Sequence, residues 1–433
     1  MKHVFITVIF FCIINFCLAS EKRLSAPDTA HHTQHSVNNQ KFLLSGLAHV
    51  RIFTDGIKFN SAVMETEFKP VFLWRPSPKF SFESQLNFTA GVGRKISNTS
   101  TFNTAKSHSH RIARSFSALL RNESTPVSEN TTTTNQIAAD ILLKYSSLTY
   151  ICTPNLSVTA GLFLSSFGMY SEQLYSELTN KFLSAPYGFG YNFQSTPETE
   201  LGIQVRGNLK LKSSGIKYAL GISNGPALIE SGTNAGQLDY ENLADNNSNK
   251  AISARIGFLP WNNRTFEIGL SSRSAKVGES GSALEGVDSR LLSADISVSK
   301  NFNSIKGMVE LKIQYTYISL DNVYYNANPL LTLNVPAKDV NLKDSTYRFD
   351  NKSELYFISL GFRPTTDNKF FKNFEYVFRY DVLNLPVFAL WGKDKTRFTG
   401  GFLYWLSENS CLKLSYEYET EEKFLVVQWV MGF

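Results

Sequence analysis

The sequence predicts an all-β protein, a transmembrane antiparallel β-barrel of about 16 strands with short periplasmic turns and long external loops. Three observations support this class. Apolar and polar residues alternate in successive segments, the chain ends on an apolar hairpin, and short and long connections alternate along it. With 42% hydrophobic and 13% aromatic residues, the chain is too polar for a helical membrane protein but suits strands with aromatic girdles.

The composition limits the classes of function. The net charge is +6 at pH 7, but no basic stripe or recognition motif accompanies it, so we expect no nucleic-acid partner. After the N-terminus no apolar run of about 18 residues occurs, which argues against spanning helices. The sequence has no glycine-rich phosphate loop and no paired-cysteine motif, and we expect no cofactor.

The N-terminus predicts export. Basic residues precede a mostly apolar run over residues 4–17, and small residues that suit cleavage after Ala19 or Ser20 follow it. We therefore assign residues 1–19 to a signal peptide. Residues 20–42 are polar and aperiodic and predict a periplasmic arm, while residues 43–433 are assigned to the barrel. The clustered histidines of the arm have no cysteine or carboxylate at ligand spacing, so we expect no metal site.

Strand-like segments follow one another along the assigned barrel, with no convincing helical period between them. Their number, about sixteen, is even, as single-chain bacterial barrels require. An apolar patch around residues 116–120 could hide a further hairpin, which would change the count by two. The ranges are 43–54, 63–74, 80–93, 137–151, 156–167, 200–211, 215–224, 251–259, 265–273, 292–300, 307–320, 354–363, 374–383, 397–405, 411–418 and 423–433.

Alternation is clear in several of these segments. Val309, Leu311 and Ile313 point one way, and Glu310 and Lys312 point the other, because successive strand residues face opposite sides. A soluble sandwich would bury the apolar faces in a core, and a barrel would place them in lipid around a polar lumen. Alternation alone fits both classes.

The lengths of the connections separate the two classes. Short and long connections alternate in step with the strands, which is the pattern of outer-membrane barrels, whereas a sandwich has no reason to sort its loops. The pattern places both termini in the periplasm. The short connections are 75–79, 152–155, 212–214, 260–264, 301–306, 364–373 and 406–410, and the long ones are 94–136, 168–199, 225–250, 274–291, 321–353 and 384–396.

The last hairpin indicates how the sheet is closed. Val427, Trp429 and Met431 share a wholly apolar face that ends on Phe433. An exposed apolar edge strand would aggregate, so another strand must cover it. A closed barrel in a membrane supplies that cover.

Loose strand and turn patterns in several segments resemble a known family. The segments are 159–170, 200–207, 218–225, 249–251 and 255–260, together with the aromatic pair at 404–405 and the run 412–417. They are similar to the phosphate-selective porin (O and P type) family of outer-membrane porins. The resemblance implies the outer membrane of a Gram-negative bacterium, surrounding lipid, passive passage of small solutes or ions, and assembly as a homotrimer.

The resemblance also implies a loop folded into the lumen, and the third external loop, 168–199, is the candidate. Its constriction candidates are Tyr170, Glu172, Tyr175, Lys181 and Tyr187. Phosphate-selective members line the pore with basic residues, and the predicted lumenal side offers Arg206, Lys210, Lys217, Arg255, Arg273, Lys312, Arg363, Arg379 and Lys413. Acidic residues are interleaved with these, so a one-sign field and phosphate selectivity are not expected.

Two other functions stay open. One is a structural or adhesive barrel whose lumen is plugged and whose external loops bind partners. The other is an outer-membrane hydrolase, because the residues around Ser223 match the letters of a nucleophile elbow. That motif needs a helix directly after the strand, and a polar loop follows here. The leading prediction is therefore a porin and not an enzyme.

Overall fold

The computed structural model describes residues 41–55, 62–95, 134–189, 195–240, 244–261, 265–326, 339–341, 346–368, 370–419 and 423–433. The predicted signal peptide and nearly all of the predicted arm lie outside these residues. Within the described part of the chain, no helix combines the length and apolar character needed to cross a membrane.

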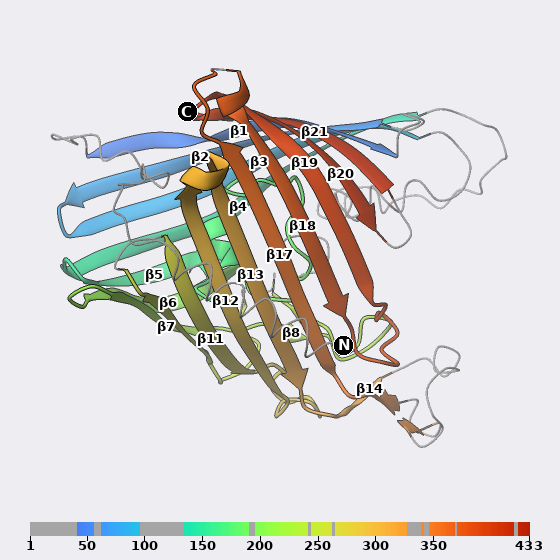
Figure 1. The fold of residues 1–433 in the computed structure, drawn as a ribbon. Coiled ribbons are helices and arrows are strands. Elements are labelled where there is room, and N and C mark those ends of the chain that lie inside the picture. Colours follow the sequence, from blue (N-terminus) through green and yellow to red (C-terminus); the bar gives the residue numbers. More distant parts are fainter. Residues whose placement is uncertain are drawn as a thin grey trace. The chain divides into compact units, whose positions relative to one another are not determined.

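Sixteen antiparallel strands form a closed barrel, which confirms the predicted fold class (Figure 1). Each strand pairs with its neighbours in the chain order of the wall, and the first strand pairs with the last. The wall consists of β1 (Phe42–Asp55), β2 (Ala62–Ser77), β3 (Phe80–Lys95), β4 (Thr134–Thr153), β5 (Leu156–Leu164), β6 (Thr199–Lys210), β7 (Gly215–Ser223), β10 (Ala251–Leu259), β11 (Phe266–Lys276), β12 (Asp288–Phe302), β13 (Gly307–Leu320), β17 (Lys352–Pro364), β18 (Phe374–Asn384), β19 (Lys395–Ser407), β20 (Ser410–Glu419) and β21 (Lys423–Gly432).

Closure joins β1 to β21. Val50 lies opposite Trp429 in this pair, and the backbone N–H of Gly46 donates to the carbonyl oxygen of Phe433 at 3.1 Å. Every wall strand therefore has two hydrogen-bonded neighbours. The wall has no open edge, which is what a sheet inside a membrane requires because lipid cannot satisfy backbone polar groups.

The two faces of the wall differ in polarity. On β20, Leu412 and Tyr418 are exposed, whereas Lys413 and Glu417 are buried. On β21, the exposed residues include Trp429. The outward side chains are thus apolar and the inward ones polar, as the alternation predicted. Hydrocarbon suits the outward face, and the charged inward face surrounds a lumen.

The long loops all lie at one end of the barrel, which we call the loop end, and the other end, the turn end, has short connections alone; the connections after β1 and after β20 are short although they lie at the loop end. Two of the predicted long loops contain small sheets. In one, β8 (Ala227–Leu228) pairs with β9 (Leu238–Asp239). In the other, β16 (Thr346–Arg348) lies between β14 (Tyr324–Asn326) and β15 (Val340–Asn341).

Strand β5 is shorter than predicted, because it ends at Leu164 and not at Phe167. The hydroxyl oxygen of Ser165 accepts a hydrogen bond from the backbone N–H of Phe167 at 3.2 Å. Gly168 then adopts a φ of 69°, in the left-handed region that glycine enters without steric cost. This local turn chemistry takes the chain out of the wall before the apolar run ends.

The loops pack against one another in an apolar cluster at the loop end. Tyr325 and Tyr347 are fully buried there, and Phe349 lies 5.2 Å from Tyr325 and 5.6 Å from Tyr347 between ring centroids. The indole N–H of Trp391 donates to the carbonyl oxygen of Ala235 at 2.8 Å, which links two loops. The long loops are therefore held by mutual packing as well as by the wall.

Candidate functional site in the barrel lumen

Inward-facing side chains of the wall form pairs of opposite charge. Arg255 of β10 bonds both carboxylate oxygens of Asp295 of β12, at 2.6 and 2.9 Å. Lys217 of β7 lies 2.7 Å from Glu267 of β11, and the same carboxylate lies 3.6 Å from Arg255. The pairs of Arg255 with Asp295 and of Lys217 with Glu267 each reach across one intervening strand, because their side chains share the inward face of the wall. The local charge of this part of the wall is therefore largely compensated.

The segment between β5 and β6, residues 165–198, bonds to side chains of distant strands. The backbone N–H of Gly168 donates to the hydroxyl of Ser271 on β11 at 3.1 Å. The next N–H, of Met169, donates to Oε1 of Gln314 on β13 at 3.0 Å. Both acceptors are buried side chains on the polar face of the wall. The start of this β5–β6 segment is therefore fixed to β11 and β13.

Glu172 connects the β5–β6 segment to two of the predicted pore-lining residues. It lies in the π-helical turn Tyr170–Leu174, and its carboxylate is 3.1 Å from Arg206 and 3.7 Å from Arg255. The side chain of Arg206 is 35% exposed and that of Lys217 is 32% exposed. These two remain the most accessible of the predicted pore-lining cations that form ion pairs.

Lys181 connects the same segment to β13 and β18. Its ammonium group lies 2.6 Å from Glu310 and also forms an ion pair with Glu375. Burial disfavours the charged amine, but the two carboxylates outweigh that effect and raise the pKa of Lys181 above its ordinary value. Lys181 therefore stays cationic, and Glu310 is shared with a second cation, Lys312.

Residues 184–185 are held by arginines of β18 and β19. Arg379 donates to the carbonyl oxygen and to the hydroxyl of Ser184, at 2.8 Å each, and Arg397 donates to the carbonyl oxygen of Ala185. The hydroxyl of Ser184 donates to Glu417 of β20 at 2.7 Å. These charge-assisted bonds to backbone fix the path of the chain and not only one side chain.

Glu177 forms a further contact with the wall, on β2. Its carboxylate pairs with Lys69, and Lys413 of β20 donates to its carbonyl oxygen and, at 2.7 Å, to that of Asn180. Burial favours the neutral acid, but the charge of Lys69 outweighs it and holds the pKa of Glu177 below its ordinary value. The carboxylate is therefore ionised at neutral pH.

The tyrosines predicted for the constriction also make defined contacts. Tyr170 is buried, and its ring lies 4.8 Å from that of Phe189. The hydroxyl of Tyr175 accepts a hydrogen bond from Gln85 of β3 at 3.1 Å. Tyr187 lies beneath the guanidinium of Arg397, 4.4 Å from the ring centroid. All five constriction candidates thus contact the wall or another part of their own segment.

The remaining pore-lining candidates differ in their surroundings. Arg273 is buried and lies 3.2 Å from Glu200. Lys210 is exposed at the end of β6, at the turn end of the barrel, and Arg363 donates to the carbonyl oxygen of Lys372 at 3.1 Å. The structure therefore brings Arg206, Lys217 and Arg255 together but leaves Lys210 apart from them.

Several residues of this charged network were not singled out from the sequence. Lys69 and Arg397 hold the β5–β6 segment, and Lys144 of β4 lies 2.6 Å from Glu198 at the end of that segment. Their inward positions on predicted strands were the available signal. Their partners are far from them in the sequence. Local periodicity carries no information about such distant pairs.

A buried group on β1 and β2 contains three potential metal ligands. His49, Glu65 and Glu67 offer ligand atoms within 4.8 Å of one another. However, Arg51 bonds both carboxylates, and Lys69 lies 2.5 Å from Glu67. These cations already neutralise the carboxylates and would repel a divalent ion. The group is better explained as a network of charged side chains than as a metal centre.

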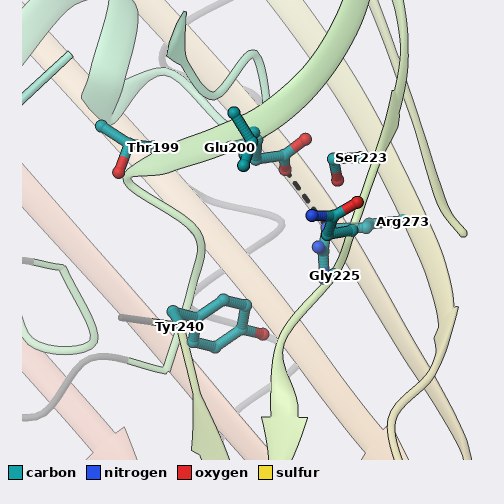
Figure 2. Close-up of a pocket in the computed structure, with 8 residues that line it drawn as sticks. Thr199, Glu200, Ser223, Gly225, Tyr240 and Arg273 are labelled. Atoms are coloured by element: carbon teal, nitrogen blue, oxygen red, sulfur yellow. Dashed lines mark hydrogen bonds and ion pairs between the residues drawn. The ribbon is translucent and has the colours of Figure 1, made fainter. Parts of the chain in front are cut away.

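A small pocket beside Ser223 tests the hydrolase alternative. Figure 2 shows the ion pair between Glu200 and Arg273 beside the hydroxyl of Ser223, with Tyr240 from the following loop also lining the pocket. The cavity measures about 10 Å³, which is room for about one water molecule. Ligand pockets for small molecules are on the order of 300 Å³ or larger. An ester or peptide substrate has no room beside Ser223, so the geometry gives the nucleophile interpretation no support.

The closed wall, its apolar outer face and its charged inner face define a transmembrane β-barrel of sixteen strands. No protein-family model matches the chain, and no curated protein matches its sequence. Among solved structures the chain is similar to OmpF of Salmonella typhi, crystallised in complex with daunomycin, with a TM-score of 0.50, 11% identity, and coverage of 90% of this chain and 97% of that one.

Two further solved structures were found at slightly lower TM-scores. OprB of Pseudomonas putida, in a low-pH structure, gives a TM-score of 0.49 at 7% identity. The alignment covers 91% of this chain and 93% of the OprB chain. The anion-selective porin of Comamonas acidovorans gives a TM-score of 0.48 at 10% identity. The alignment covers 90% of this chain and 99% of the porin chain. At these identities the likeness to OmpF concerns the fold alone, and the narrower resemblance to phosphate-selective porins stays a prediction.

Proposed function

We propose that this protein is a porin of the outer membrane of a Gram-negative bacterium, through which small solutes or ions diffuse passively. The observation that carries the proposal is the closed barrel of sixteen strands with lipid-compatible side chains outside and paired charges inside. A water-filled lumen is the environment that stabilises such an inner face. The signal peptide predicted at 1–19, the arm predicted at 20–42 and the likeness of the fold to OmpF support the same assignment.

We also propose that residues 168–199 narrow the pore. The support comes from the spread of their wall contacts, which reach β2, β6, β11, β13, β18, β19 and β20. A segment bonded to strands so far apart around a closed wall must pass through the space that the wall encloses. On this proposal Glu172, Arg206 and Lys217 border the remaining passage, because their side chains are the most exposed of the ion-paired lumenal charges named above.

The ion selectivity proposed for this passage is weak. The family resemblance suggests a phosphate-selective lining, but Arg255, Arg273, Lys312 and Arg379 each have a carboxylate partner. Paired charges cancel at distances longer than their separation, so no continuous basic track attracts anions. We further propose a homotrimer embedded in outer-membrane lipid, which chemical cross-linking in native membranes would test.

Conductance in a planar lipid bilayer tests the proposed function. The purified, folded protein should produce stepwise, ohmic current, and the reversal potential in a salt gradient should lie close to zero. A barrel that inserts and gives no current would contradict the porin assignment. A strongly anion-selective current would support the phosphate-selective alternative and contradict the weak selectivity proposed here.

A second candidate is a barrel with a closed lumen whose external loops bind a partner. The apolar cluster at the loop end favours it, because buried residues of several long loops and of the β5–β6 segment pack together there. The two candidates differ in the bilayer experiment, since a closed barrel inserts without conducting. The enzyme alternative has no comparable support among the described residues.

A further inference from the structure

The turn end of the barrel carries exposed cations on most of its described connections. The exposed basic residues there, which we call the basic rim, are Lys41, Arg75, Lys79, Lys210, Lys212, Lys306 and Lys372. The exposed acidic residues of the same described connections are Asp367 and Glu408. The turn end therefore presents a strong excess of positive charge to its surroundings.

Each cation of the basic rim is next in sequence to an exposed apolar side chain, so that the two lie at the same level of the barrel wall. Trp74 precedes Arg75 and is 49% exposed, Phe80 follows Lys79 and is 41% exposed, and Leu211 separates Lys210 from Lys212. The other neighbours are Phe42 beside Lys41, Ile305 beside Lys306, and Phe371 beside Lys372, each about half exposed.

This pairing of groups matches the boundary between hydrocarbon and headgroups. Aromatic and aliphatic side chains settle at the edge of the acyl region, and long basic side chains extend from there towards phosphates. An anionic polymer in solution would need the cations but would leave the apolar neighbours without a function. The combination therefore favours a lipid headgroup over a soluble anion.

At the loop end, three exposed cations are paired with carboxylates. Lys250 pairs with Asp245, Arg348 pairs with Asp339, and Lys352 pairs with Asp350. Within the described part of the chain, no ion pair links a cation of the basic rim to a carboxylate. The excess charge of the rim is therefore available to an outside partner, and its sign selects an anion.

We propose that the basic rim binds the phosphodiester headgroups of anionic phospholipids in the leaflet that surrounds the turn end. The ligand class is an anionic phospholipid such as phosphatidylglycerol. Its headgroups contact the basic side chains of several neighbouring turns. This inference rests on the membrane placement in the proposed function, but it does not require the lumen to conduct.

Quenching of tryptophan fluorescence by brominated lipids tests the proposal on the full chain. Trp74 and Trp261 are exposed at the turn end and report on lipids bound there. The vesicles mix dibrominated phosphatidylglycerol with phosphatidylcholine at low salt. The relative binding constant of the anionic lipid should exceed that of phosphatidylcholine by about threefold or more. The preference should fall towards equality at about 1 M salt, because exposed charges are then screened.

A pair of matched variants locates the site. Replacing Arg75, Lys79 and Lys212 of the rim by Gln should abolish most of the preference, whereas replacing Lys250, Lys276 and Arg290 at the loop end by Gln should leave it intact. Equal loss in both variants, or no preference in the unmodified protein, would overturn the proposal. If the rim variant does not fold, the salt titration of the unmodified protein decides.

Conductance measured on the same samples separates the two proposals. A protein that conducts without preferring the anionic lipid overturns only the basic-rim site. A protein that prefers the anionic lipid without conducting keeps the site and overturns only the porin assignment.

Discussion

At the scale of single residues, the lumenal arginines have different roles. Arg255 is buried against Asp295, and Arg255→Gln would leave that carboxylate buried without its partner. The loss of one member of a buried pair costs about 3–5 kcal/mol. We expect Arg255→Gln to lower the free energy of unfolding by that order, measured by urea titration of the refolded barrel. Arg206→Gln serves as the matched control, because the Arg206 side chain is partly exposed.

Ion selectivity should respond to Arg206 and Lys217, which keep contact with solvent. The double variant Arg206→Gln with Lys217→Gln removes two positive charges and leaves Glu172 and Glu267 beside the passage. We expect the reversal potential in a salt gradient to shift towards cation selectivity, with a few-fold change in the permeability ratio. An unchanged reversal potential would show that ions do not pass these side chains.

At the scale of elements, Lys181 forms ion pairs that connect the β5–β6 segment to Glu310 of β13 and to Glu375 of β18. Lys181→Met keeps the size of the side chain and removes the charge, while Lys312 stays beside Glu310 and the indole N–H of Trp405 stays 3.0 Å from Glu375. We expect the segment to lose about 1.5–3 kcal/mol of anchoring and to become more mobile, because the charge-assisted bonds of Lys181 are gone while both carboxylates keep a partner.

The measurement for this variant is the single-channel current. Lys181→Met should raise the mean conductance or the current noise, whereas Lys276→Met, on an exposed site of β11, should change neither. Conductance and noise equal to those of the unmodified protein would contradict the view that this segment narrows the pore.

The wall strands were predictable because their information is local. A period of two in Val427, Trp429 and Met431 fixes which face meets lipid, and turn residues fix where strands stop. The path of the β5–β6 segment was only partly predictable. Its aromatic residues indicated packing, but the contact between Lys181 and Glu310 joins distant parts of the chain, and the early end of β5 depends on the conformation at Gly168.

At the scale of the whole molecule, closure turns local alternation into an enclosed charged space. Each inward strand face adds one row of polar groups, and the rows meet across the barrel only after β1 pairs with β21. The pairing of a wall charge with the β5–β6 segment, as between Lys69 and Glu177, therefore depends on the assembled wall. No single segment of the sequence contains both partners.

Acid should loosen this assembly through Glu177. Its pKa in the folded protein lies below the ordinary value of 4.5, because the attraction of Lys69 outweighs the effect of burial. A group with a depressed pKa contributes stability that is complete above its unfolded pKa and is lost as the pH falls through the folded pKa. We therefore expect conductance that is constant near neutral pH and rises below about pH 4.5 as Glu177 is protonated and the segment detaches.

The variant Glu177→Gln separates this cause from other titrating groups. It removes the charge that Lys69 binds, and it leaves the neighbouring His49 and Glu67 and the bonds of Lys413 to backbone carbonyl oxygens in place. At neutral pH the variant should already show part of the rise in conductance that the unmodified protein shows in acid, and its remaining dependence on pH should be shallower. If both proteins follow the same curve, the acid response arises from other carboxylates, and the contact between Lys69 and Glu177 does not control the position of the β5–β6 segment.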